Sequence, residues 1–186
     1  IWYKPEASKD NHKAFVYFPG GGYNNVDVLN GGDQYGRTFA AKGYTVVVCW
    51  YRGYNPKDDS PFKDANAAML AVRAYAKTLG ITEVGVAGDS AGGHLASYQH
   101  VHGTGNAKSD FAILAFPCIT CGESTSYGFS GNIGATTDDA KRGYCNDLFV
   151  TAATGRAFIY VATSDAMEQI IVLGHGAERV SARAFR

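Results

Sequence analysis

The chain has 186 residues, which is the size of one ordinary domain, and we expect residues 1–186 to form a single domain. Seventeen Lys and Arg balance seventeen Asp and Glu, so the chain lacks the positive excess with which proteins bind nucleic acids or anionic membranes. An apolar share of 46% is enough for a hydrophobic core and excludes disorder caused by low hydrophobicity.

Five short segments bounded by Gly, Pro or Asp are predicted to be strands: residues 14–18, 45–50, 83–87, 111–116 and 157–162. All but 83–87 are nearly continuous apolar runs, which is typical of strands that are buried on both faces of a parallel sheet. The longest apolar stretch, 111–119, is broken by Pro117 and is too short to span a membrane.

Helical patterns over residues 33–41, 64–78 and 91–100 alternate with these strands. In the second helix Asp64 is expected to cap the N-terminus, and an apolar stripe is predicted to face the core, made of Ala68, Leu70, Ala71, Ala74 and Tyr75. Alternating strands and helices predict an α/β fold in layers around a mostly parallel sheet. Residues 120–156 are rich in Gly, Ser, Thr and Asp and are predicted to be a long irregular excursion at the sheet edge.

The ends and the cysteines say little about the compartment, so a cytoplasmic and a secreted location both stay open. The chain opens at Ile1 without a leader pattern, and we expect a trimmed chain or part of a longer protein. Cys118 and Cys121 have the spacing of half a zinc site, but two further ligands are wanting, so no metal is expected. We expect reduced packing thiols, with a disulfide among Cys118, Cys121 and Cys145 as the alternative.

The segment Gly88-Asp89-Ser90-Ala91-Gly92 carries the chemistry. It lies between a predicted strand and a predicted helix and fits G-x-S-x-G, in which a serine sits on a sharp turn with its hydroxyl exposed. A glycine-rich nucleotide-binding turn is the alternative, but that would need G-x-G-x-x-G or a Gly-Lys-Ser/Thr ending, and neither is present. We predict that Ser90 is a nucleophile.

A second glycine motif, Pro19-Gly20-Gly21-Gly22-Tyr23, follows the first predicted strand. Consecutive glycines at a strand end allow backbone N–H groups to converge on one point, as acyl transfer requires for its oxyanion. We expect the N–H groups of Gly21, Gly22 and Ala91 to form an oxyanion hole. Tyr23 and Trp50 are candidates to line an acyl or sugar pocket, although aromatic residues near a strand end are more often part of the core. Of the two, Tyr23 is our candidate substrate-binding residue.

On these motifs the sequence resembles the α/β-hydrolase superfamily, in particular the compact esterases of the hormone-sensitive-lipase and feruloyl/acetyl esterase group. The segments that carry the likeness are FVYFPGGGY, GDSAGGH and ATSDAM, at residues 15–23, 88–94 and 162–167, together with Tyr51-Arg52. Many relatives have His where this chain has Pro19. The resemblance implies a three-layer α/β-hydrolase sandwich, here with a shortened sheet and no cap domain.

A serine nucleophile needs a histidine base oriented by a carboxylate. Asp165 follows the last predicted strand and matches the acid of the resembled family, while Asp138, Asp139 and Asp147 have no strand end beside them. His175 is selected as the base by elimination, since His12 precedes the first strand, His94 is expected to be a buried packing residue, and His100 and His102 lie far along the serine's own helix. Only ten residues separate Asp165 from His175, fewer than the family's usual thirty, so a truncated ending and a lost base stay open.

We therefore expect a cofactor-free serine carboxylic-ester hydrolase that takes short acyl or aryl esters, such as acyl groups on plant polysaccharide. The alternative is a non-catalytic binding module of the same fold that has lost its base; a peptidase shares the triad and stays a third, weaker alternative. Arg52 and Asp64 are expected to be scaffold partners rather than substrate contacts. No nucleic-acid or membrane partner is expected, and the oligomeric state is not predicted.

Overall fold

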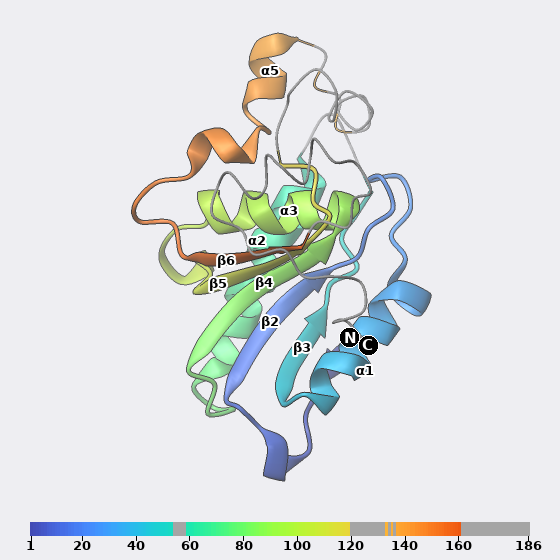
Figure 1. Cartoon of the computed structure of the whole chain (residues 1–186), viewed down its shortest axis with the longest axis vertical. Coiled ribbons are helices and arrows are strands. Elements are labelled where there is room, and N and C mark those ends of the chain that lie inside the picture. Colours follow the sequence, from blue (N-terminus) through green and yellow to red (C-terminus); the bar gives the residue numbers. More distant parts are fainter. Residues whose placement is uncertain (54–58, 120–132, 134, 136, 161–186) are drawn as a thin grey trace.

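In the computed structural model, residues 1–53, 59–119, 133, 135 and 137–160 are described (Figure 1). Their sheet has the strand order β1-β3-β2-β4-β5-β6. The strands are β1 (Trp2–Tyr3), β2 (Lys13–Phe18), β3 (Tyr44–Val48), β4 (Glu83–Asp89), β5 (Phe111–Ala115) and β6 (Arg156–Tyr160). Strand β1 pairs antiparallel with β3, and every other neighbouring pair is parallel. The predicted mostly parallel sheet is confirmed.

Helices lie on both faces of this sheet (Figure 1). They are α1 (Asp33–Ala41), α2 (Ser60–Ala76) and α3 (Ser90–His102), and a short helix α5 (Asp138–Arg142) follows later in the chain. Alternation along β2 separates the two cores: Val16 packs with residues of α2 and α3, whereas Tyr17 packs with residues of α1. The three layers predicted from the alternating pattern are present.

Short 3₁₀ helices and one π-helix connect these elements. They are η1 (Ala7–Lys9), η3 (Gly105–Ala107) and η4 (Asn146–Phe149), which are 3₁₀ helices, and η2 (Val28–Gly32), a π-helix that leads into α1. Asp27 caps η2 by accepting hydrogen bonds from two backbone N–H groups. The predicted irregular excursion therefore contains two helical turns, α5 and η4, within its described part.

Helix α2 differs from its prediction in both start and orientation. It begins at Ser60, so Asp64 is not its cap; the Asp64 carboxylate instead accepts hydrogen bonds from the backbone and guanidinium of Arg52. Leu70 and Tyr75 of the predicted stripe are exposed. The helix buries another face, made of Phe62, Ala65, Met69, Val72 and Ala76. Alanines make this helix apolar on more than one side, so the stripe could not be read from periodicity, and the larger side chains decided which side faces the sheet.

The last described strand and one cysteine also differ from expectation. All five residues of β6 are exposed, because it lies at the end of the described sheet and pairs with β5 alone. Cys145 is disulfide-bonded, so the reduced state expected for it is wrong, whereas Cys49 and Cys118 are free thiols.

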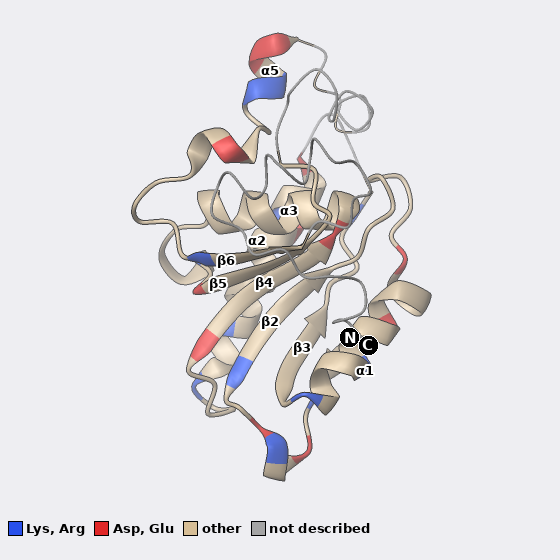
Figure 2. Cartoon of the chain, viewed as in Figure 1, with Lys and Arg blue, Asp and Glu red and all other residues tan. Residues whose placement is uncertain are grey.

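Charged residues lie at strand ends, in loops and in helices (Figure 2). At the amino ends of the parallel strands, Glu83 lies 2.6 Å from the Lys13 ammonium and 2.5 Å from the Arg156 guanidinium. None of the described helices is long and apolar enough to cross a membrane. In the same part of the chain, no group of three His, Cys, Asp or Glu side chains is placed to hold a metal.

Candidate active site

Ser90 lies where β4 ends and α3 begins, on the sharp turn that the sequence predicts. Its φ of 51° puts this non-glycine residue in the left-handed region, a conformation that costs roughly 1–3 kcal/mol. The residue is half-buried, at the carboxyl edge of the sheet and at the positive end of the α3 dipole. This position suits a hydroxyl that becomes the site of developing negative charge.

Two glycines flank the serine because the neighbouring backbone leaves no room for a side chain. A Cβ at Gly92 would lie 1.9 Å from the carbonyl oxygen of Phe18 and 2.6 Å from that of Pro19. A Cβ at Gly88 would lie 2.3 Å from the carbonyl oxygen of Gly92. The first turn of α3 is therefore packed directly against the end of β2, where the glycine loop starts.

Asp89 links the nucleophile turn to the glycine loop. Its Oδ1 accepts a hydrogen bond of 2.5 Å from the Tyr17 hydroxyl and one of 2.9 Å from the Gly20 N–H. Burial, and then the Asp89 carboxylate, raise the pKa of Tyr17, so the phenol stays protonated and donates. The Gly20 N–H is thereby engaged, and the next two N–H groups along the chain belong to Gly21 and Gly22, the two oxyanion donors expected from the loop.

The glycine loop closes on itself directly after these donors. The carbonyl of Gly21 accepts hydrogen bonds from the N–H groups of Asn24 (3.1 Å) and Asn25 (3.0 Å). Gly21 has a φ of 130°, and a Cβ there would lie 1.5 Å from the Asn25 carbonyl oxygen, so only glycine fits. These hydrogen bonds hold Gly21, Asn24 and Asn25 in one compact turn near the start of α3.

Tyr23 does not lie where a substrate-binding residue would. Its side chain is completely buried and packs against the rings of Tyr51, Phe62 and His94, so no face of it is open to a ligand. Its hydroxyl lies 2.6 Å from Nδ1 of His94. Apolar packing and a buried hydrogen-bond partner hold it in the core, and the substrate-binding role expected from its place in the sequence is not supported.

His94 is the buried packing residue that the sequence predicts. Its Nε2 lies 2.9 Å from the Tyr144 carbonyl oxygen, which only accepts, so Nε2 carries the proton and Nδ1 accepts from Tyr23. Burial lowers the pKa of His94 to about 4. With both ring nitrogens engaged, His94 ties the glycine loop to the segment around Tyr144 and is unsuited to receive a proton from Ser90.

The other described histidines also lie away from the nucleophile. His12 precedes β2, at the opposite end of the sheet from Ser90. His100 hydrogen-bonds to the Ser109 hydroxyl and the Gly155 carbonyl, and the ring of His102 packs at a tilt against those of Tyr98 and Phe149 near the end of α3. His175 and Asp165 lie outside the described residues.

The other candidate acids lie away from strand ends, and the expected scaffold pair is formed. Asp138 and Asp139 begin α5, and Asp147 lies in η4, none of them at the end of a described strand. Arg52 and Asp64 form a two-point ion pair, with an Nη2–Oδ1 distance of 2.7 Å, and are scaffold partners as expected. The link between Tyr17 and Asp89 was not foreseen, because these residues are 72 positions apart and no motif connects them.

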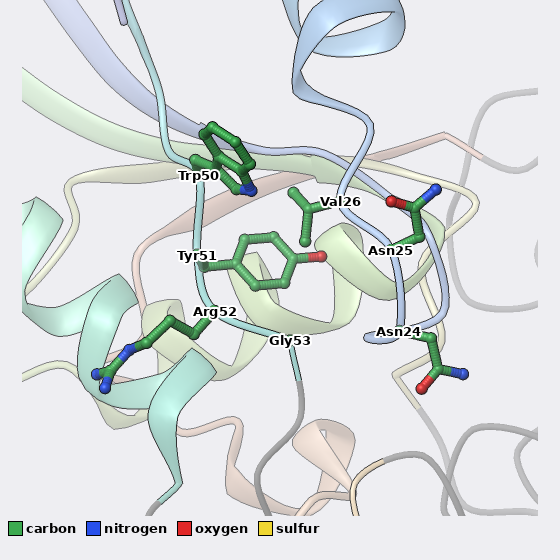
Figure 3. Close-up of a pocket in the computed structure, with 7 residues that line it drawn as sticks. All are labelled: Asn24, Asn25, Val26, Trp50, Tyr51, Arg52 and Gly53. Carbon is green, nitrogen blue, oxygen red and sulfur yellow. The ribbon is translucent and has the colours of Figure 1, made fainter.

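A pocket of about 370 Å³ opens between the loop after β2 and the loop after β3 (Figure 3). It is lined by Asn24, Asn25, Val26, Trp50, Tyr51, Arg52 and Gly53. Its two walls are therefore the continuation of the glycine loop and the segment that carries Trp50, both at the carboxyl edge of the sheet.

Comparison with known families gives two matches. A family model described as BD-FAE matches residues 2–134, which include the glycine loop, the nucleophile turn and the pocket. A second model, described as a YacP-like NYN domain, matches residues 138–186, of which the structure describes 138–160.

Individual relatives point to the same fold. An acetylxylan esterase of Xylanibacter ruminicola is 32% identical over 120 residues, which are 63% of this chain but only a quarter of that protein's length. An acetyl ester-xyloside bifunctional hydrolase from Caldicellulosiruptor lactoaceticus superposes with a TM-score of 0.75 at 24% identity, over 94% of this chain and 71% of the other. Esterase 2 of Thermogutta terrifontis gives a TM-score of 0.72 at 23% identity over the same shares. The predicted α/β-hydrolase fold is confirmed.

Proposed function

Because the chain belongs to the BD-FAE family, we propose that it is a serine carboxylic-ester hydrolase that acts through an acyl-enzyme formed on Ser90. The observation that carries this proposal is the strained left-handed turn at Ser90, packed against a glycine loop at the carboxyl edge of the sheet. Ordinary strand-to-helix connections have no need of such strain, which is typical of functional sites.

In the proposed reaction the Ser90 hydroxyl oxygen attacks the carbonyl carbon of the ester while His175 takes its proton. The N–H groups of Gly21, Gly22 and Ala91 stabilise the oxyanion of the tetrahedral intermediate. As that intermediate collapses, the C–O bond to the alcohol breaks and His175 returns the proton to the alcohol oxygen. Water then repeats the sequence to release the acid, and Asp165 orients the imidazole throughout.

The assignment of His175 is supported by elimination among the described histidines. His94 uses both ring nitrogens in buried hydrogen bonds, and the other three lie at the wrong end of the sheet or of α3. Asp165 is proposed as the acid because it follows β6, whose carboxyl end lies at the same sheet edge as Ser90.

We further propose that the part of the chain after residue 134 belongs to the same domain as the rest. Strand β6 pairs in parallel with β5 over five positions, from Phe111↔Arg156 to Ala115↔Tyr160. A stretch that continues the hydrolase sheet in this way favours one domain over a separate YacP-like NYN unit.

The substrates proposed are short acyl esters, with acetyl groups on polysaccharide as the natural class. The names of two relatives, an acetylxylan esterase and an acetyl ester-xyloside hydrolase, support this class. The glycine loop and the turn of Ser90 meet at the carboxyl edge of the sheet, and a half-buried serine there suits small acyl groups better than long lipid chains.

Turnover of p-nitrophenyl acetate tests the proposal. The wild-type chain is expected to hydrolyse it, and the Ser90→Ala variant to lose at least a thousandfold in kcat while keeping the thermal unfolding midpoint of the wild type within a few degrees. Equal turnover in the two proteins would overturn the assignment. A fluorophosphonate probe separates the alternative, since a folded wild type that stays unlabelled would be a binding module without an active base.

A further inference from the structure

We propose that the pocket between residues 24–26 and 50–53 is a subsite for a neutral pyranose ring in the alcohol part of the ester. This inference rests on the proposed esterase function, since it assigns the part of the substrate that leaves after acyl transfer. Three properties of the pocket's described lining carry it: an exposed aromatic platform, two amide side chains, and a single charged residue that is already paired.

The aromatic platform is Trp50, whose side chain is 79% exposed although tryptophan is mostly buried in folded proteins. In Figure 3 its indole stands at one side of the pocket, with Val26 and the ring of Tyr51 next to it. A pyranose presents a face of C–H groups that is apolar and flat enough to stack on such a ring. Because leaving a large aromatic surface in water is unfavourable, a partner that covers Trp50 gains free energy on binding.

The amide side chains are those of Asn24 and Asn25 on the opposite wall of the pocket (Figure 3). Both are exposed, and neither side-chain amide hydrogen-bonds to another described residue. Each offers two N–H donors and one carbonyl acceptor, the combination that sugar hydroxyls need because they both donate and accept. Their backbones are fixed by the two hydrogen bonds to the Gly21 carbonyl, so the amides are carried by the same turn as the oxyanion donors.

The charge of the pocket favours a neutral ligand over a carboxylate. Among the described residues that line the pocket Arg52 is the one that carries a charge, and its guanidinium points away from the other lining side chains toward α2 (Figure 3). There it contacts the Asp64 carboxylate at 2.7 Å. A uronic acid or other anion would find its attraction to Arg52 offset by that carboxylate, whereas an uncharged sugar needs no counter-charge.

The position of the pocket fits the distance between acyl and sugar groups. Strand β2 lies between β3 and β4 in the sheet, so the segment after β3 is two strand spacings, roughly 10 Å, from the end of β4 at Ser90. The loop after β2 bridges this span. An acetyl group on Ser90's hydroxyl and the ring that carried it would together cover a distance of this order.

The decisive experiment compares two substrates in two variants. For the wild type and for Trp50→Ala, kcat/KM is measured with acetylated xylo-oligosaccharide and with p-nitrophenyl acetate. The ratio of the two values is expected to fall about tenfold in Trp50→Ala, the effect of one lost stacking contact. Trp2→Phe is the matched control, because Trp2 is the other tryptophan of the chain and lies on β1 at the far side of β3, and its ratio is expected to match the wild type.

A ratio that stays within twofold of the wild type in Trp50→Ala would overturn the subsite. So would a larger loss with methyl ferulate than with the acetylated oligosaccharide, since this would make Trp50 a platform for an aryl acid instead. Asn24→Ala combined with Asn25→Ala is expected to lower the same ratio in the same direction.

A binding measurement separates this inference from the proposed function. In the Trp2→Phe variant Trp50 is the remaining tryptophan, so its fluorescence reports on the pocket alone. Titration with xylotetraose is expected to change the emission with a saturable millimolar dependence even if the chain hydrolyses no ester. Hydrolysis of p-nitrophenyl acetate without any fluorescence change would leave the proposed function standing and refute the subsite.

Discussion

Replacing Asp89 with alanine tests whether the nucleophile turn and the glycine loop are one unit. The variant removes the acceptor of two hydrogen bonds, from the Tyr17 hydroxyl and the Gly20 N–H, and both donors are buried. Leaving a buried donor without an acceptor costs about 1–3 kcal/mol. Asp89 is itself only half-buried, so water reaches part of the gap, and we expect the free energy of unfolding to fall by about 3 kcal/mol.

Urea denaturation of the wild type, Asp89→Ala and Asp89→Asn measures this effect, with the slope m checked for constancy. Asparagine keeps a neutral Oδ1 acceptor in the same place, so Asp89→Asn is expected to lose only about 1 kcal/mol. In the same proteins kcat for p-nitrophenyl acetate is expected to fall more than tenfold in Asp89→Ala with KM nearly unchanged, because loosening the loop moves the oxyanion donors. A loss below about 0.5 kcal/mol in the alanine variant, or equal losses in both variants, would refute the reasoning.

Three further substitutions probe the packing around the site. Gly92→Ala places a Cβ 1.9 Å from the Phe18 carbonyl oxygen and is expected to lower the free energy of unfolding in urea by about 3 kcal/mol. Gly105→Ala is expected to cost clearly less, because φ is positive there but the space around the new Cβ is open. Equal losses in the two variants would contradict the close approach of Gly92 to Phe18. Tyr23→Phe is expected to cost about 1–2 kcal/mol by leaving Nδ1 of His94 without a donor, with KM for p-nitrophenyl acetate unchanged; a raised KM at unchanged stability would restore Tyr23 as a substrate contact. Burial lowers the pKa of His94 from 6.5 to about 4, so the unfolded chain binds the proton more readily between these values, and stability that is complete above pH 6.5 is lost as the pH falls toward 4. Wild type is expected to lose about 3 kcal/mol more than His94→Gln over this range in urea titrations, and parallel curves would disprove the buried neutral imidazole.

The parts of the molecule that the sequence predicted are those set by local pattern. Continuous apolar runs placed the centres of β2, β3 and β5, and the span of α1 was predicted to the residue. The turn at Ser90 was predicted because G-x-S-x-G is a compact pattern of five consecutive residues, although the crowding at Gly92 comes from Phe18 and Pro19 at the end of β2. Where neighbours along the chain decide the structure, the prediction succeeded.

The parts that were missed depend on contacts between distant residues. The inner face of α2 was chosen by Phe62, Met69 and Val72 against the sheet, which an alanine-rich sequence does not reveal. For Tyr23 the sequence left a pocket position and a core position open, because its partner His94 lies 71 positions away. The candidate base and acid depend on residues 161–186 and stay predictions.

At Ser90 the left-handed backbone conformation lowers the stability of the fold, and the same residue supplies the proposed nucleophile. Glycine adopts a φ of 51° without the strain that serine bears, so Ser90→Gly is expected to raise the free energy of unfolding by about 1 kcal/mol, measurable as a shifted urea midpoint. The more stable protein would have no nucleophile. Selection for stability alone would therefore favour glycine at this position. The serine that occupies it lowers the free energy of unfolding and is explained by its function. A designer who wants a hyperstable scaffold from this chain has an obvious first substitution, and it is the one that abolishes the proposed reaction.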